Sequence, residues 1–236
     1  MLTLVEENPM ITINGLTKRF GNVTALDDIS VFLKKGEIIG LLGENGSGKT
    51  TLLKILAGLY MDYEGCVQID GQVPSAVTKG KVSYLPDKVS FDKEKNTKEV
   101  LTFYRTYFDD FNEKKCRRLL QKMEIDMERP FKEMSKGMIE KIQLCVALSR
   151  DAMVYLLDEP IGGVDSNARE VVMDAILDSF DGNSSMIIVT HQIHQMQRLM
   201  DRAVVLKEGR IIGNGLCEEL VMRYGKPLEE IVREMK

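Results

Sequence analysis

The stretch "GENGSGKT", residues 43–50, decides the fold. It satisfies the pattern G-x-x-x-x-G-K-[ST], whose glycines let the backbone approach an anion closely. The apolar run "EIIGLL" at 37–42 predicts a strand buried on both faces, and "TTLLKILAGL" at 50–59 has apolar residues at helical spacing. A strand, a glycine-rich turn and a helix in this order predict a phosphate-binding loop at a helix N-terminus.

The loop and the helix start are expected to surround phosphate groups. Lys49 would reach the β- and γ-phosphates, and the Thr50 hydroxyl would ligate Mg²⁺. The predicted phosphate-binding residues are Gly43, Glu44, Asn45, Gly46, Ser47, Gly48, Lys49, Thr50 and Thr51.

A second apolar strand, "VYLLDEP" at 154–160, ends in two adjacent carboxylates. Carboxylates after a buried strand are costly unless a cation or hydrogen bonds compensate their charge. Asp158 therefore fits a Mg²⁺ ligand, and Glu159 fits a general base that polarises a water molecule for attack on the γ-phosphate.

The rest of the pattern predicts an α/β fold in which strands alternate with helices around a mainly parallel sheet. Further strands are expected at 10–14, 29–33, 66–71 and 185–190, and a hairpin at 203–212 with its turn at Glu208 and Gly209. Helical periods occupy 97–150, 167–180 and the last twenty residues. Ligands of such a sheet bind at the carboxyl ends of its strands.

The composition narrows the class of protein. The 236-residue chain carries a formal charge of −4, which argues against a surface built mainly for nucleic acid. Its four cysteines lack metal-ligand spacing and are expected to be reduced thiols of a cytosolic protein. The apolar runs are too short to span a bilayer, and the N-terminus lacks the pattern of a signal peptide, so membrane work would require another chain.

With these motifs, the chain resembles the nucleotide-binding subunit of ATP-binding cassette (ABC) transporters over residues of about 10–215. "MSKGM" at 134–138 is similar to the signature of that family, with Ser135 and Gly137 in matching positions. "GVDSNAR" at 163–169 places Asp165 in the family's next loop, and "VTHQ" at 189–192 places His191 where the family has its switch histidine. Phe20 matches the aromatic residue that stacks on adenine.

The resemblance implies a P-loop NTPase core of the ABC type, with an antiparallel β subdomain and an inserted helical subdomain. Within one domain at 1–236, the core with the β subdomain would take 10–86 and 152–215. The helical signature subdomain would take 88–150, and C-terminal helices 216–236.

The chain departs from the family at "SYLPDKV", residues 83–89, where Asp87 replaces the usual glutamine. Asp87 is expected to line the site, either as a ligand of the metal or as a charge that repels the γ-phosphate until Mg²⁺ screens it. Gln195 and Gln197 also replace acidic residues that are common after the switch histidine.

The resemblance further implies ATP and Mg²⁺ as cofactors, and two cassettes, from one or two kinds of chain, that sandwich ATP head to tail. Ser135 and Gly137 would then bind the γ-phosphate of the opposing subunit, whereas Ser135 alone could be a simple N-cap. The expected partner is an integral membrane subunit, with this chain on the cytoplasmic face, and the "SKGM" variant resembles that of bacterial exporters of drugs, peptides or lipid-like substrates. The alternatives are a soluble ABC ATPase without a transport role and a regulatory module that does not hydrolyse ATP.

A cluster of aromatic residues lies in "TKEVLTFYRTYFDDF" at 97–111. Their helical spacing fits either the core of the helical part or a groove that accepts a short helix of a membrane subunit. The aromatic residues are Phe103, Tyr104, Tyr107, Phe108 and Phe111.

Overall fold

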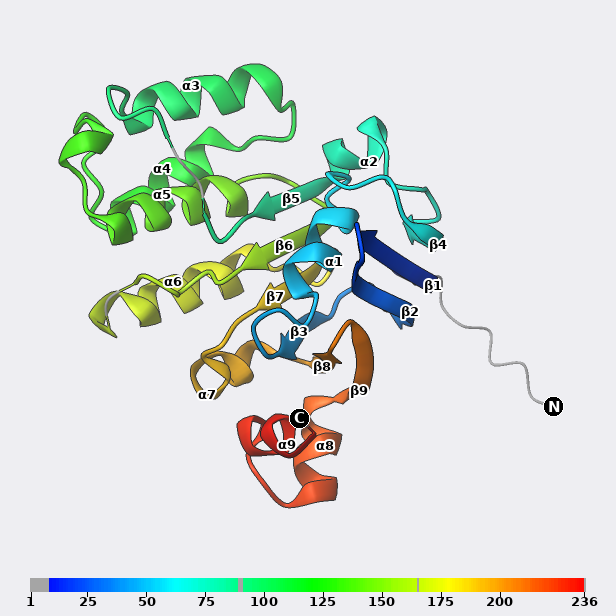
Figure 1. Ribbon diagram of the computed structural model, residues 1–236. Coiled ribbons are helices and arrows are strands. Elements are labelled where there is room, and N and C mark those ends of the chain that lie inside the picture. Colours follow the sequence, from blue (N-terminus) through cyan, green and yellow to red (C-terminus); the bar gives the residue numbers. More distant parts are fainter. Residues whose placement is uncertain (1–8, 89–90, 165, 236) are drawn as a thin grey trace.

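The structure is a computed structural model, and it describes residues 9–88, 91–164 and 166–235. The described residues form two sheets (Figure 1). The large sheet has the strand order β5-β6-β7-β3-β8-β9; all its pairs are parallel except the antiparallel pair β8-β9. Its strands are β3 (Ile38–Gly43), β5 (Val82–Leu85), β6 (Val154–Asp158), β7 (Ser185–Val189), β8 (Arg202–Lys207) and β9 (Arg210–Leu216).

The second sheet is antiparallel and has the order β2-β1-β4. It consists of β1 (Ile11–Phe20), β2 (Val23–Leu33) and β4 (Glu64–Ile69). The first two strands extend beyond the predicted ranges 10–14 and 29–33. They continue past irregularities in their register and join in a tight turn after Phe20.

Nine α-helices lie within the described residues, and Figure 1 shows α3, α4 and α5 together at the β5 end of the large sheet, with α8 and α9 beyond β9. Two short 3₁₀ helices cover Phe131–Glu133 and Gln197–Leu199. The α-helices are α1 (Lys49–Leu56), α2 (Ala76–Lys81), α3 (Thr97–Tyr107), α4 (Glu113–Lys122), α5 (Lys136–Leu148), α6 (Ser166–Ser179), α7 (Ile193–Met196), α8 (Cys217–Tyr224) and α9 (Leu228–Met235).

The core has two parts, one on each face of the large sheet. Side chains alternate along β6, so Val154 and Leu156 pack in the part formed with α1 and the small sheet. Tyr155 and Leu157 pack in the part formed with α3 to α6 and the C-terminal helices. Burial on both faces explains why the central parallel strands read as continuous apolar runs.

The interval 97–150 is helical as expected, but it is divided into three helices by caps. Asn96 and Asn112 accept hydrogen bonds from the backbone N–H groups of Glu99 and Lys115 and so begin α3 and α4. The hairpin of β8 and β9 turns at Glu208 and Gly209, as predicted. Helix α2 was not expected from the sequence, because its six residues are too few to show a helical period.

Candidate functional site

The turn between β3 and α1 has a backbone that only glycine fits at two positions. Gly43 and Gly48 have φ angles of 145° and 106°. A Cβ atom would lie 2.2 Å from the Leu206 carbonyl oxygen at the first position and 2.5 Å from the Ala25 carbonyl oxygen at the second. Gly48 begins α1 without a side-chain cap, so the N–H groups of the first helical turn are available to an anion.

Lys49 is the first residue of α1, and only 5% of it is exposed. Its ammonium donates hydrogen bonds to the carbonyl oxygens of Gly43 (3.1 Å) and Glu44 (2.6 Å). A buried ammonium requires such acceptors, and the oxygens of a phosphate group are stronger acceptors than carbonyls. The lysine is therefore held at the loop in a position from which it can turn to a bound phosphate.

A cavity of about 370 Å³ opens beside this loop. It lies where β5, β6 and β7 end, which agrees with the expectation that ligands bind at the carboxyl ends of parallel strands. Ala25 and Val189 also line it and were not anticipated from the sequence. The lining residues are Ala25, Asn45, Gly46, Gly48, Lys49, Thr50, Thr51, Asp87, Asp158, Glu159, Val189 and His191.

Three residues of the predicted phosphate loop are not among those that line the cavity: Gly43, Glu44 and Ser47. Gly43 and Glu44 contribute the carbonyl oxygens that hold Lys49. Ser47 is buried, and its carbonyl oxygen accepts a hydrogen bond of 3.1 Å from the N–H of Gly209. These three residues therefore hold Lys49 and the loop in place and do not line the cavity.

Thr50 and Asp158 meet at the floor of the cavity. The Thr50 hydroxyl donates a hydrogen bond of 2.9 Å to an Asp158 carboxylate oxygen. Burial raises the pKa of Asp158, the Thr50 hydrogen bond opposes this shift, and the nearby Asp87 charge adds to it. The site thus holds buried negative charge that a cation would relieve.

These residues fit Mg²⁺. A hydroxyl and a carboxylate are the oxygen ligands that this ion takes, and in nucleotide sites one or two protein oxygens suffice because phosphate oxygens complete the shell. The described residues contain no group of three or more His, Cys, Asp or Glu side chains that could hold a metal by themselves. Thr50 and Asp158 would hold the ion, with Asp87 at the cavity wall, and the ion would neutralise charge on the phosphates.

Glu159 has an unusual backbone and an unusual acidity. Its φ angle of 54° lies in the left-handed region, which costs a non-glycine residue about 1–3 kcal/mol. Burial raises the pKa of its carboxyl to about 7; a hydrogen bond from the His191 backbone N–H (3.3 Å) opposes this, and the Asp158 charge adds to it. A base with a pKa near the working pH is well suited to proton transfer.

His191 lies two residues after β7 and faces Glu159. Its Nε2 is 3.4 Å from the Glu159 carboxylate oxygen Oε1, and both residues line the cavity. The imidazole is about half exposed, so it can contact a ligand that fills the cavity as well as the glutamate.

Ser135 and Gly137 lie at the start of α5, away from this cavity. Ser135 caps the helix, since its hydroxyl oxygen accepts a hydrogen bond of 3.2 Å from the Met138 N–H. Gly137 packs against the loop after β6, where a Cβ atom would lie 2.9 Å from the Gly163 carbonyl oxygen. None of the described cavity-lining residues comes from α5. The structure therefore does not bring the signature residues and the phosphate loop together within one chain.

Phe20 lies at the end of β1, and 42% of it is exposed. It pairs with Val23 across the β1–β2 turn, two residues before the cavity-lining Ala25. Its ring contacts the Tyr60 ring edge to face, with 5.3 Å between the centroids. Asp165, also expected at the site, lies outside the described residues.

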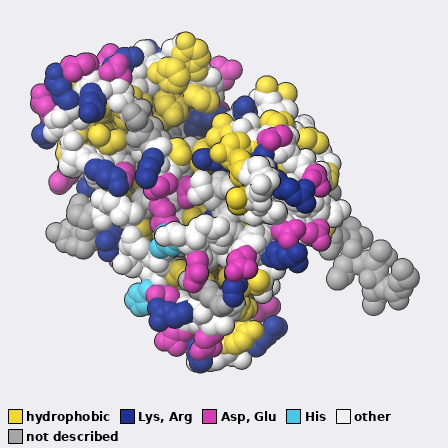
Figure 2. All heavy atoms as spheres, in the orientation of Figure 1, with side chains coloured by type: hydrophobic (Ala, Val, Ile, Leu, Met, Phe, Trp, Pro, Cys, Tyr) yellow, Lys and Arg dark blue, Asp and Glu magenta, His cyan; other side chains and the backbone are white. Residues whose placement is uncertain are grey.

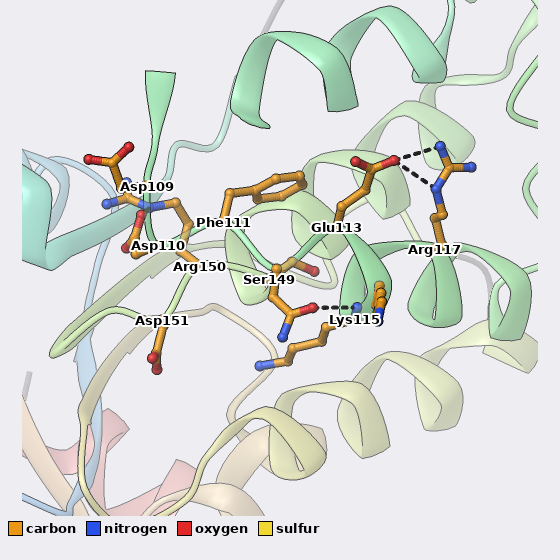
Figure 3. Close-up of a pocket in the computed structure, with 11 residues that line it drawn as sticks. Asp109, Asp110, Phe111, Glu113, Lys115, Arg117, Ser149, Arg150 and Asp151 are labelled. Carbon is orange, nitrogen blue, oxygen red and sulfur yellow. Dashed lines mark hydrogen bonds and ion pairs between the residues drawn. The ribbon is translucent and has the colours of Figure 1, made fainter. Parts of the chain in front are cut away.

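A larger cavity of about 830 Å³, shown in Figure 3, lies where α4 and the end of α5 meet the chain after α3. Arg150 is buried there and donates hydrogen bonds to the Asp110 carboxylate (2.7 and 2.9 Å) and the Gly80 carbonyl oxygen (2.7 Å). Glu113 and Arg117 form an ion pair at its rim. The buried Arg150 guanidinium therefore has a structural role at this cavity, because its hydrogen bonds link α2 to the chain between α3 and α4.

Within the described residues, no helix has both the length and the apolar character that crossing a membrane requires.

Comparison with known proteins gives one consistent family. The family model described as "ABC transporter" matches residues 26–162. An ABC transporter ATP-binding protein of Methanocaldococcus jannaschii is 34% identical over 217 residues, which cover 90% of this chain and 79% of that protein.

Two relatives named for opposite directions of transport have the same sequence identity to this chain. The Nod factor export ATP-binding protein I of Ralstonia nicotianae is 29% identical, with 92% of this chain and 70% of that protein covered. The xylose import ATP-binding protein XylG of Photobacterium profundum is also 29% identical, with 87% and 43% covered.

Among solved structures, an ATP-binding subunit of an ABC transporter superposes with a TM-score of 0.85, over 96% of this chain and 99% of that one. At 23% sequence identity, this likeness supports the fold alone.

Proposed function

The chain belongs to the ABC transporter family as an ATP-binding subunit that hydrolyses ATP, and from this premise we propose how its residues perform that reaction. The observation that carries the proposal is the convergence of Lys49, Thr50, Asp158, Glu159 and His191 on one cavity at the end of three parallel strands. Catalysis would be positioning and charge stabilisation, because phosphoryl transfer to water requires no covalent chemistry from the protein.

Each of these residues has one role in the proposal. The α1 N-terminus and Lys49 bind the phosphates, and Thr50 and Asp158 hold Mg²⁺. Glu159 removes a proton from the attacking water, because its buried carboxyl has a pKa of about 7. His191, 3.4 Å from that carboxylate, orients it and contacts the γ-phosphate.

We propose that the working unit contains two cassettes. Ser135 and Gly137 lie at a helix N-terminus that the chain's own phosphate cavity does not include. A helix N-terminus favours an anion, and in a head-to-tail pair this one would contact the γ-phosphate held by the opposing subunit. ATP would then close the pair, and hydrolysis would open it, because only the γ-phosphate makes contacts that differ between the two states.

The proposed membrane partner docks beside the Asp87 loop. A groove of about 480 Å³ lies there between this loop and α5. Its floor includes the Phe91 and Phe131 rings, stacked with 4.7 Å between their centroids. Its lining carries more basic than acidic side chains, although Lys132 and Lys136 already pair with glutamates. The charged lining residues are Lys88, Lys93, Lys132, Lys136, Asp87 and Glu140. An apolar floor with a basic rim fits a short amphipathic helix that carries acidic residues.

Exposed hydrophobic side chains occur close by. Tyr104 and Phe111 pack against the core, whereas Phe103 and Tyr107 of α3 are exposed and would be available to such a helix. Figure 2 shows hydrophobic side chains gathered over α3 and again over α2 and the end of α1. The exposed members of the second group are Leu59, Met61, Val73 and Val77.

Export is the proposed direction of transport, of a drug, peptide or lipid-like substrate from the cytoplasmic face. The "SKGM" signature and the relative named for Nod factor export support this direction. The relative named for xylose import supports the opposite direction, so the direction of transport needs a direct test. The test is to isolate the complex from its native membrane, identify the co-purifying chains, and follow substrate movement in inside-out vesicles. ATP-dependent accumulation of substrate inside the vesicles supports export, and ATP-dependent loss from preloaded vesicles contradicts it.

Hydrolysis itself is tested on the purified chain. Mg²⁺-dependent ATP turnover should vanish in Lys49→Ala and persist in Lys114→Ala, a change of an exposed lysine on α4. Equal turnover in the two variants would remove Lys49 from the proposed role.

A further inference from the structure

A lysine ammonium is buried beneath the proposed base-binding ring. Lys18 lies on β1, two residues before Phe20, and only 2% of it is exposed. Its Nζ donates a hydrogen bond to the Asp62 carbonyl oxygen (2.7 Å) and forms an ion pair with the Asp62 carboxylate (2.6 Å). Asp62 lies in the segment between α1 and β4, two residues before β4, so this contact holds that segment against β1.

The same ammonium lies over two aromatic rings. Nζ is 4.6 Å from the centroid of Phe20 and 5.6 Å from that of Tyr60. Both distances are within the range of a cation–π interaction. Tyr60 and Phe20 also contact each other edge to face, so the two rings and the cation form one cluster.

The chemistry of the ammonium explains why this cluster is ordered. An ammonium has three N–H donors, and burying it is costly unless each finds an acceptor. Asp62 supplies two acceptors, its carbonyl oxygen and its carboxylate. The faces of the aromatic rings provide a further favourable interaction with the positive charge. The ion pair itself adds little, because the Asp62 side chain is 86% exposed and water screens it. The main effect of the Lys18 ammonium is therefore to hold the Phe20 and Tyr60 rings in place.

We propose that Lys18 is a positioning residue that fixes the Phe20 ring for stacking on the base of ATP. This inference rests on the proposed role of Phe20 in binding the base. Through its contacts with Asp62 and Tyr60, Lys18 ties that ring to the segment that connects α1 to β4. A cation on one side of the ring also withdraws electron density from it, which favours stacking on an electron-rich purine.

The test is Lys18→Met in the full chain, which keeps an unbranched side chain of similar length and removes the charge. We expect the Kd for ATP to rise roughly 3–30-fold, the range that corresponds to a desolvated cation–π contact. The Kd for inorganic tripolyphosphate, which has no base, should stay unchanged, and so should kcat at saturating ATP. Lys18→Arg should restore most of the ATP affinity.

Arg19→Met is the matched control. Arg19 is the next residue of β1; it is exposed and pairs with Glu64. Its replacement removes the same charge from the same strand and leaves the contacts of the Phe20 and Tyr60 rings in place. We expect no change in either Kd. If Lys18→Met does not fold, Lys18→Gln removes the charge but keeps a donor for the Asp62 carbonyl oxygen, and it should weaken ATP binding in the same direction with tripolyphosphate binding unchanged.

Phe20→Ala separates this inference from the function on which it rests. If Phe20→Ala leaves ATP affinity unchanged, the base-stacking role itself is wrong. If Phe20→Ala weakens ATP binding but Lys18→Met does not, only the positioning role is overturned. A parallel loss of tripolyphosphate binding in Lys18→Met would also overturn it, since that result indicates general damage to the fold. In the Phe20→Ala background, Lys18→Met should have no further effect.

Discussion

The Thr50 hydroxyl and the Asp158 carboxylate are joined by a hydrogen bond of 2.9 Å at the floor of the phosphate cavity. The two groups come from residues 108 positions apart and are brought together by the order of strands in the large sheet, in which β7 separates β3 from β6. Each satisfies the other in the absence of a cation, and both are oxygen donors that Mg²⁺ accepts.

Replacing Thr50 by Val should raise the Mg²⁺ concentration needed for half-maximal ATPase activity by about 10–100-fold, the usual cost of losing a partner at a metal site. Valine keeps the shape of threonine and removes only the hydroxyl. Titration of activity with Mg²⁺ at fixed ATP measures the effect. Thr102→Val, the same change at an exposed threonine on α3, is the control, and equal shifts in both variants would argue against a specific role for Thr50.

Glu159→Gln should retain ATP binding and lower turnover by about 10²–10⁴-fold, the size of a general-base contribution. The amide keeps the size of the side chain but cannot accept the proton of the attacking water. Bound ATP should accumulate, and a sizing column should show a dimer that wild-type protein forms only transiently. Turnover within twofold of wild type would exclude Glu159 as the base.

The rate constant kcat/KM for ATP should rise with pH and level off above about pH 7. This constant reports the free enzyme, in which burial raises the pKa of Glu159 to about 7, so the base is protonated and inactive below that value. The Asp87 charge contributes to raising this pKa, so Asp87→Gln should move the profile toward lower pH. A profile that is flat between pH 5.5 and 8 would contradict the assignment.

The same carboxyl should make the nucleotide-free protein less stable as pH rises. Its pKa is raised from an ordinary value of 4.5 to about 7, so the folded state binds the proton more tightly than the unfolded state. The stability gained from this is complete below about pH 4.5 and is lost as pH rises through 7, a change of up to about 3 kcal/mol. Denaturant unfolding without Mg²⁺ or ATP should show wild type losing stability relative to Glu159→Gln across this window, and a constant difference would refute it.

The sequence predicted the fold because its strongest signals are local. The phosphate loop, the buried strands and the carboxylates after β6 each lie in one short stretch, and parallel topology alone brings strand ends to one edge. Six of the predicted loop residues, from Asn45 to Thr51, line the cavity together with Asp158, Glu159 and His191.

The missed features depend on contacts between distant segments. Ala25 lines the cavity only because the β1–β2 register and a close approach to Gly48 place it there. Lys18 meets Tyr60 and Asp62 through the packing of the small sheet on the end of α1. The left-handed backbone of Glu159 has no local signal either, since glutamate is not a residue type that favours it.

Gly137→Asp should leave ATP binding to the monomer intact and prevent ATP-driven dimerisation. Even a Cβ at this position would lie 2.9 Å from the Gly163 carbonyl oxygen, and an added carboxylate at the α5 N-terminus would repel the γ-phosphate of the opposing subunit. The matched control is Gly80→Asp, a change of a helical glycine on α2 whose Cβ would meet no atom within 4 Å. In the Glu159→Gln background, a sizing column with ATP should show monomer for the first variant and dimer for the second, while fluorescent ATP binds both with similar Kd. If Gly137→Asp still dimerises with ATP, the signature helix does not close the site in trans, because the carboxylate would then lie where the phosphate must be.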